Sequence, residues 1–100
     1  MPVTVVAQLV INEDEAQALG KYFEVTMPLL RAAGAKIVKR YRQISSIAGP
    51  DKDYTIVVVE YPDEAAVRSV FDSDAYHSAA PYRDRAFSEY QINVYTTEEA

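Results

Sequence analysis

Residues 54–87, YTIVVVEYPDEAAVRSVFDSDAYHSAAPYRDRAF, decide the fold. They begin with a β-branched run that is apolar at consecutive positions, which is typical of a strand covered on both faces. Pro62 ends this strand, and Asp63 can cap the helix that follows. A strand with two apolar faces needs two covers, and a chain of 100 residues readily supplies only one. The stretch therefore predicts a small α+β domain that completes its core with a second copy of itself.

The sequence around this stretch predicts three further strands and one further helix. β-Branched and aromatic residues indicate strands at 3–11, 35–47 and 88–96, besides the one at 54–61. Apolar residues at helical spacing indicate a helix that runs to about Ala33 and ends at Gly34. The order βαββαβ, with a broken second helix, is the ferredoxin-like arrangement: a four-stranded antiparallel sheet with the helices on one face. We expect a single domain over residues 1–97 and a frayed tail at 98–100.

Local signals suggest how the first helix begins and packs. Asn12 followed by Glu15 matches a capping box, with asparagine in place of the usual serine or threonine. Leu19 and Phe23 are expected to face the core, and Pro28 to kink the helix or start a new segment.

The second helical region carries similar signals. Val67 and Val70 are expected to face the core, and Ser73 can cap a further short helix that contains Tyr76. Pro81 should break or restart that helix.

The second strand is the most highly charged. Strict alternation from residue 35 to residue 47 would place Lys36, Arg40 and Arg42 on one face and Lys39 on the other.

The sheet is predicted to be apolar on its open face as well as on the helix face. In a lone unit the open face should be polar at alternate positions. Instead Val6 and Val10 occupy that face of the first strand, and Ile56 and Val58 lie opposite Val57 in the third. Soluble monomers avoid a contiguous apolar patch of this kind. The prediction is a homodimer formed through the open sheet face.

Composition excludes several classes of site and partner. Without cysteine there are no disulfides, thiolate nucleophiles or cysteine-bound metals. A single histidine cannot build a multi-histidine metal site within one subunit, so we expect no metal. The net charge of −5 argues against nucleic acid. We expect no membrane partner, because no apolar run reaches eighteen residues, and a cytoplasmic location, because no basic leader is seen.

Several motifs in order resemble one family. These are Pro28-Leu29-Leu30 before Gly34, Arg40 in the second strand, Gly49 before the loop, Tyr61-Pro62, Asp72-Ser73 before Tyr76, and Pro81-Tyr82-Arg83. In this order they resemble the domain of unknown function 1330 family, within the dimeric α+β barrel superfamily. The resemblance implies a homodimer of face-to-face sheets, with a pocket between the helices and the sheet in each subunit. Superfamily relatives include cofactor-free monooxygenases, small-lactone isomerases, polyketide cyclases and haem-degrading enzymes.

The candidate ligand-binding residues are Arg40, Tyr76 and Arg83. A guanidinium on Arg40 would need either an internal carboxylate, with Glu60 as the nearest candidate, or an anionic ligand. Tyr41 follows it where the family usually has glycine, which hinders close approach of a ligand. Tyr76 would line a pocket, and Arg83 could close it or bind a nearby carboxylate.

The only candidate catalytic residue is His77, whose side chain alone has an ordinary pKa near neutrality. It should point about 100° away from the apolar face that carries Tyr76, which favours a partly exposed helical histidine over a catalytic one.

Two functions remain open at this point. The first is a homodimer that binds a small carboxylated or aromatic molecule, with any catalysis being cofactor-free proton transfer or oxygenation. The second is a binding or assembly module without enzymatic activity or substrate. A haem-degrading enzyme is a third reading, which would depend on His77 as the axial ligand.

Overall fold

Four strands form one antiparallel sheet in the order β2-β3-β1-β4. The computed structural model describes residues 1–98. Its strands are β1 (Val3–Ile11), β2 (Lys36–Arg42), β3 (Thr55–Tyr61) and β4 (Phe87–Tyr95). Its helices are a 3-10 turn η1 (Glu13–Glu15), α1 (Ala16–Ala32), α2 (Glu64–Phe71), α3 (Asp74–Ser78) and α4 (Ala80–Ala86). The predicted ferredoxin-like fold is confirmed.

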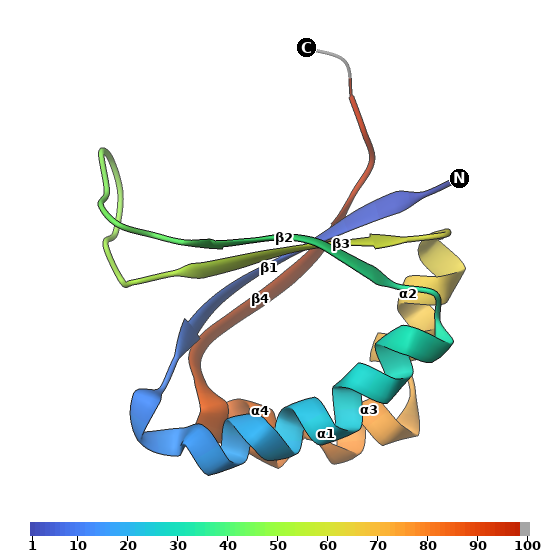
Figure 1. The fold of residues 1–100 in the computed structure, drawn as a ribbon, viewed down its shortest axis with the longest axis horizontal. Coiled ribbons are helices and arrows are strands. Elements are labelled where there is room, and N and C mark those ends of the chain that lie inside the picture. The colour runs from blue at the N-terminus through green and yellow to red at the C-terminus, as the bar shows by residue number, and fades with distance from the viewer. Residues whose placement is uncertain (99–100) are drawn as a thin grey trace.

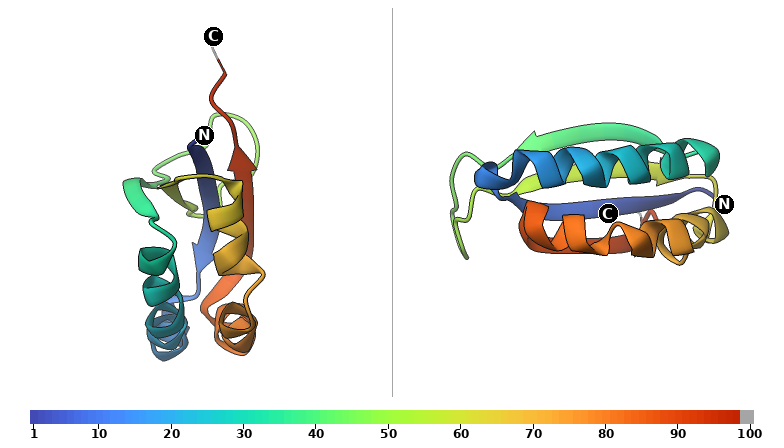
Figure 2. Two further views of the ribbon diagram at one scale, coloured as in Figure 1. Left: turned by 90° about the vertical axis from the view of Figure 1, so that its right-hand side faces the viewer. Right: turned by 90° about the horizontal axis from the view of Figure 1, so that it is seen from below.

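All the helices cover the same face of the sheet (Figure 1). Seen end-on and from below, α1 forms one row under the β2 side, and α2 to α4 form a second row under the β4 side (Figure 2). Within residues 1–98, the other face of the sheet carries no helix. Of the predicted tail, Glu98 is exposed and lies beyond β4, and residues 99 and 100 lie outside the described residues.

The core lies between the helices and the sheet. Val5, Ala7 and Leu9 of β1 point toward the helices, as the alternation along a strand requires. Val59 and Tyr61 of β3 extend this layer, and further buried side chains come from the helices.

The helix α1 packs through a different stripe from the one predicted. Its buried residues are Ala18, Tyr22 and Thr26, spaced by four, and Phe23 remains 40% exposed. Leu19 lies at the edge of the stripe and packs against the core. Hydrophobicity alone favoured Phe23 over Tyr22, but the hydroxyl of Tyr22 finds partners in the interior. The helix continues through Pro28 and curves toward the sheet in its second half (Figure 1).

The caps of the second helical region are confirmed. An oxygen of Asp63 accepts a hydrogen bond from the Ala66 amide at 2.7 Å and begins α2. The Ser73 hydroxyl accepts one from the Tyr76 amide at 3.0 Å and begins α3. Pro81 lies in the first turn of α4, where a missing amide hydrogen costs nothing.

The predicted capping box at Asn12 is wrong. The Asn12 side chain donates to the Arg85 carbonyl at 2.9 Å and makes no cap bond. The Glu15 carboxylate likewise binds the Arg85 guanidinium at 2.9 Å. Both side chains therefore join the start of α1 to the end of α4. Their partner is Arg85, distant in sequence, instead of the nearby backbone amides that a capping box would use.

The second strand is shorter than predicted and its alternation is broken. It ends at Arg42 rather than residue 47, and Ile44 and Ile47 lie fully exposed in the loop that follows. A register shift between Ile37 and Lys39 moves the charges. Lys36 and Lys39 therefore pair with Glu60 and Val58 on the open face, and Arg40 and Arg42 pair with Val57 and Thr55 on the helix side.

The open face of the sheet keeps an apolar centre. Val6 lies directly opposite Val58, and Gln8 opposite Ile56, across the β1–β3 pair. These side chains and Val10 are only half-buried in the single chain. The face thus leaves apolar area that a second surface can cover.

Gly34 is the position where glycine itself is required. Its φ of +74° ends α1, and the amide of Ala35 bonds back to the Leu30 carbonyl at 3.0 Å. A Cβ at this position would meet Pro62 at 3.3 Å. Gly34→Ala should therefore lower the free energy of unfolding by about 1–2 kcal/mol, measured by urea denaturation.

Gly20→Ala provides the matched control for this substitution. Gly20 lies inside α1, and a Cβ there meets nothing within 4 Å. Alanine at this position should stabilise the protein by up to about 1 kcal/mol. Equal effects of the two substitutions would contradict the role assigned to Gly34.

Candidate functional site

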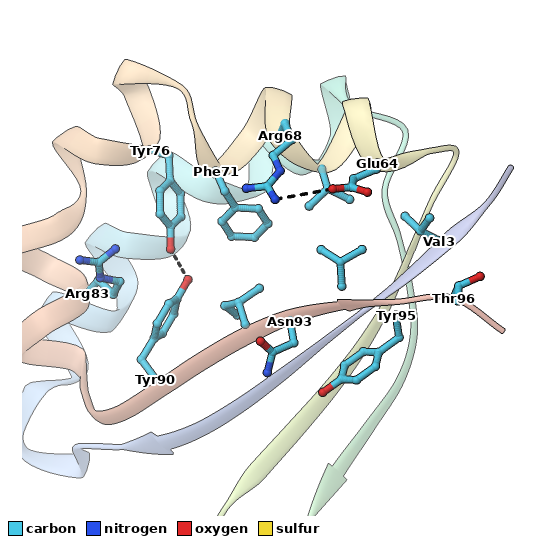
Figure 3. A pocket seen from close by; sticks show the side chains of 13 residues that line it. Val3, Glu64, Arg68, Phe71, Tyr76, Arg83, Tyr90, Asn93, Tyr95 and Thr96 are labelled. Carbon is cyan, nitrogen blue, oxygen red and sulfur yellow. Dashed lines mark hydrogen bonds and ion pairs between the residues drawn. The ribbon is translucent and has the colours of Figure 1, made fainter. Parts of the chain in front are cut away.

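A groove runs along β4 beneath α2, α3 and α4 (Figure 3). It encloses about 630 Å³, the size of a typical small-molecule site. Its lining is mixed, with polar side chains from the helices and the Tyr90 hydroxyl from β4. The apolar members include Val3, Phe71 and Ile92, and the polar members include Glu64, Arg68 and Arg83. Asn93 borders the groove only from the open face of the sheet, because it pairs with Val6 (Figure 3).

Three tyrosine hydroxyls meet at the inner end of this groove. Tyr22 of α1 lies 3.1 Å from the hydroxyl of Tyr76 in α3 and 3.0 Å from that of Tyr90 in β4. The Tyr76 and Tyr90 hydroxyls are also hydrogen-bonded to each other (Figure 3). The rings of Tyr76 and Tyr90 each stand nearly perpendicular to the Tyr22 ring. We call these three residues the tyrosine cluster.

Burial fixes the protonation state of the tyrosine cluster. Removal from water, followed by the neighbouring hydroxyls of Tyr90 and Tyr76, raises the pKa of Tyr22 far above its ordinary value. Burial likewise raises the pKa of Tyr90. Both hydroxyls therefore stay protonated at neutral pH. They can donate hydrogen bonds to a ligand oxygen, but they cannot act as a general base.

Arg83 places a positive charge beside the tyrosine cluster. Its guanidinium carbon lies 5.9 Å from the centre of the Tyr76 ring and 5.4 Å from that of Tyr90. The side chain is only 26% exposed, and its single carboxylate partner within residues 1–98 is the exposed Asp84 at 3.3 Å. Contact with two rings stabilises the cation without neutralising it. The charge remains available to an anion in the groove.

A second cation lies nearer the mouth of the groove. Arg68 pairs with Glu64 at 3.5 Å, and both side chains are 61% exposed (Figure 3). A pair this exposed contributes little to stability, so Arg68 is free to exchange partners.

Two of the predicted ligand residues come together and the third does not. Tyr76 of α3 and Arg83 of α4, seven residues further along the chain, line the same groove. Arg40 is exposed on β2, the opposite edge strand, where it borders a shallow depression with Arg42 and Asp53.

The internal pair of Arg40 with Glu60 is absent from the single chain. Arg40 lies opposite Val57 on the helix side, whereas Glu60 lies opposite Lys36 on the open face. The bulge in β2 separates their directions. Ligand binding by Arg40 stays a prediction.

His77 is exposed on α3 and lines neither the groove nor the interior. Its ring centre lies 6.3 Å from that of Tyr76, on the outer side of the helix. A proton-transfer role for His77 therefore stays a prediction that no contact in the groove supports.

A second, smaller space lies behind the tyrosine cluster. This apolar cleft of about 110 Å³ runs between α1 and the sheet toward β2. Phe23, Met27 and Leu30 of α1 line it, and Ile37 stands at its outer end. Tyr22 and Tyr90, which the sequence analysis did not single out, border it, and the count of eight tyrosines was the only signal of such a cluster.

Metal and membrane sites were also sought in the described part of the chain. Residues 1–98 contain no group of three side chains of the kinds that usually hold a metal ion. Within the same residues, no helix has the length and apolarity needed to cross a bilayer.

The fold and groove together define a class: a ferredoxin-like α+β protein with a groove of small-molecule size between helices and sheet. The family model for the domain of unknown function 1330 matches residues 3–95. The chain belongs to this family, as the resemblance implied. Comparison with curated proteins gives no match.

Solved structures share this fold at low sequence identity. RPA0582 of Rhodopseudomonas palustris, a protein of unknown function, has a TM-score of 0.81 at 19% identity, over 99% of this chain and 84% of its own. SnoaB of Streptomyces nogalater, a cofactor-independent oxygenase, has a TM-score of 0.65 at 12% identity, over 99% of this chain and 95% of its own. A Caulobacter crescentus protein provisionally assigned as an antibiotic biosynthesis monooxygenase has a TM-score of 0.66 at 17% identity, over 98% of this chain and 91% of its own. At these identities the likeness shows the fold alone.

Alkaline titration tests the protonation state of the buried tyrosines. Burial, and after it the nearby Tyr76, raises the pKa of Tyr61 to about 12, and the shift of Tyr22 is larger. A tyrosine whose pKa is higher in the folded than in the unfolded protein stabilises the folded state. This contribution is complete below the unfolded pKa of about 10, and it is lost as the pH rises through the folded pKa. Stability should therefore fall between pH about 10 and 12, and tyrosinate absorbance from these residues should appear only with unfolding.

The Tyr22→Phe variant tests whether Tyr22 ionises only on unfolding. It should reduce the tyrosinate absorbance that appears together with the loss of circular dichroism. It should not change the tyrosinate absorbance that appears at lower pH, while the protein is still folded. Loss of early amplitude instead would show that Tyr22 ionises in the folded protein.

Proposed function

We propose that this protein is a homodimeric domain that binds a small carboxylated or aromatic molecule in the groove between its helices and sheet. The observation that carries the proposal is the position of Arg83. Its half-buried guanidinium contacts two tyrosine rings and has no buried carboxylate partner within residues 1–98. A cation held in this way is suited to an anionic ligand.

The groove offers a carboxylate two kinds of interaction at once. Arg83 supplies a charge-assisted hydrogen bond, and the hydroxyls of Tyr76 and Tyr90 lie at the same end. Phe71 and Ile92 provide the apolar surface that an aromatic or aliphatic body requires. The electrostatic interactions gain strength because this end of the groove is shielded from water.

The same arrangement is suited to stabilising an oxyanion. An enolate or phenolate formed in a cofactor-free proton transfer or oxygenation would be held by a cation and by neutral hydroxyl donors. The fold is shared with SnoaB, a cofactor-independent oxygenase, which supports this extension. The proton acceptor would have to be a group other than Tyr22 and Tyr90, because the hydroxyls of these two residues remain protonated.

The alternative is a binding or assembly module without a substrate. The observation that favours it is that the three hydroxyls already satisfy one another. Against it stands the groove, which opens to solvent beside these tyrosines and retains an unneutralised cation.

The homodimer is proposed to form through the open sheet face. Val6, Val10, Ile56 and Val58 form a half-buried apolar centre on this face. A stable interface buries roughly 800 Å² on each partner, with an apolar core and a polar rim. The lysines of β2 and Glu60 at the margin of the face provide such a rim.

Calorimetric titration with benzoate and phenylacetate tests the ligand proposal. Both acids should bind with one site per subunit, and the matched neutral amides should bind at least tenfold more weakly, because Arg83 recognises charge. Equal binding of acids and amides, or no binding of either, would contradict the proposed function.

A further inference from the structure

The groove and the apolar cleft lie on two sides of the same four side chains. Phe71, Tyr76, Tyr90 and Ile92 border both spaces. The groove opens beside β4, and the cleft extends to Ile37 on β2, at the opposite edge of the sheet. Together they form one space between the helices and the sheet, divided by these four residues.

The two halves of this space have different chemistry. The β4 side contains Glu64, Arg68 and Arg83 among its lining residues. The β2 side is lined almost entirely by apolar side chains, and the tyrosine hydroxyls mark the boundary between the halves. A ligand that is polar at one end and apolar at the other would match this division.

We propose that the site binds an amphipathic carboxylate whose apolar body extends from the tyrosine cluster into the cleft toward β2. The carboxylate lies beside Arg83 and accepts hydrogen bonds from Tyr76 and Tyr90, in place of the bond that joins these two hydroxyls. This inference rests on the proposed function and specifies the class of ligand.

The position of the cluster makes this exchange chemically reasonable. The hydroxyl of Tyr90 is protonated, so it can donate to a carboxylate instead of to its neighbour. The bond between Tyr76 and Tyr90 is neutral, whereas the bonds that replace it involve a charged acceptor and are stronger. Phe71, only partly buried and edge-on to Tyr76 at 4.9 Å between ring centres, is the side chain whose movement would join the two spaces.

The cleft sets the expected dependence on ligand length. Each methylene transferred from water into an apolar space should raise affinity by about fourfold. The gain should end when the apolar body has filled the cleft of about 110 Å³.

Calorimetric titration with straight-chain carboxylates from butyrate to dodecanoate, each below its micelle concentration, tests the inference. Affinity should rise with chain length and then reach a plateau, with one site per subunit. The matching alcohols should bind at least tenfold more weakly than the acids at every length, because they lack the charge.

The variant Ile37→Ser locates the apolar body. Ile37 is 50% exposed on an edge strand, so the substitution should leave the fold intact. It should lower the affinity for the longest acids several-fold and leave that for butyrate unchanged. If this variant does not fold, Phe23→Ser, which alters the cleft from the exposed side of α1, serves the same purpose.

The outcomes separate this inference from the proposed function. Short acids that bind without any gain from added methylenes would overturn the inference and leave the proposed function standing. Failure of every acid, short and long, to bind would overturn both. Equal affinities of acids and alcohols at every chain length would show adsorption to exposed apolar surface and would also overturn the inference.

Discussion

Replacement of Arg83 by glutamine should weaken the binding of benzoate by about ten- to a hundredfold. A hydrogen bond to a charged group contributes about 1.5–3 kcal/mol, and glutamine removes the charge while keeping a polar side chain of similar length. The fold should be preserved, because the variant loses only an ion pair with the exposed Asp84 and the contacts of the guanidinium with the rings of Tyr76 and Tyr90. Calorimetric titration gives the affinity, and urea denaturation gives the stability of the same variant.

Arg85→Gln is the matched control for this experiment. Arg85 lies on the same helix, is 62% exposed and binds Glu15 instead of facing the groove. The Arg85→Gln variant should bind benzoate within about twofold of the wild-type affinity, because Arg85 makes no contact with the ligand. A large loss in both variants would point to the overall charge of the protein, and a loss in neither would remove Arg83 from the site.

Substitution of Val58 by aspartate should convert the proposed dimer to a monomer. Val58 pairs with Val6 at the centre of the open sheet face, so a dimer would bury one new carboxylate from each subunit. Burying an unpaired charge costs several kcal/mol, and the two copies together should raise the dimer dissociation constant by at least about a thousandfold. Sedimentation equilibrium across a range of protein concentrations measures this change.

Ala65→Asp controls for the introduction of a negative charge. Ala65 is exposed in the first turn of α2, where an acidic side chain is favourable. This variant should remain a dimer. If Val58→Asp also remained a dimer, the open sheet face could not be the interface.

The fold could be predicted because its signals are local. Apolar residues on both faces of the strand predicted β1 and β3. Asp63 and Ser73 predicted the starts of the helices that they cap, and Gly34 predicted the end of α1. Each of these features depends on a few neighbouring residues, whose chemistry is visible in the sequence.

The errors arose where distant partners override local preference. Asn12 binds the carbonyl of Arg85 rather than its own helix, a contact across 73 positions in the chain. The bulge in β2 reversed the direction of Arg40 relative to Lys36, and nothing in the sequence marks its position.

The candidate site could be predicted only in part for the same reason. Tyr76 and Arg83 were recognised because they lie in one helical region, seven residues apart. Tyr22 joins Tyr76 and Tyr90 across 54 and 68 positions, so only the folded chain shows that the three hydroxyls meet. Periodicity placed Phe23 in the core instead of Tyr22, because it weighs hydrophobicity and not hydrogen bonding.

Native mass spectrometry with added benzoate tests the central claim most directly, with wild-type protein and Arg83→Gln measured side by side. The wild-type protein should appear as a dimer that gains one benzoate mass for each subunit, and the variant as a dimer that gains none at the same concentration. Equal adducts on both proteins, or a wild-type dimer that gains no mass, would contradict a ligand site built on Arg83. A wild-type monomer would contradict the proposed use of the open sheet face.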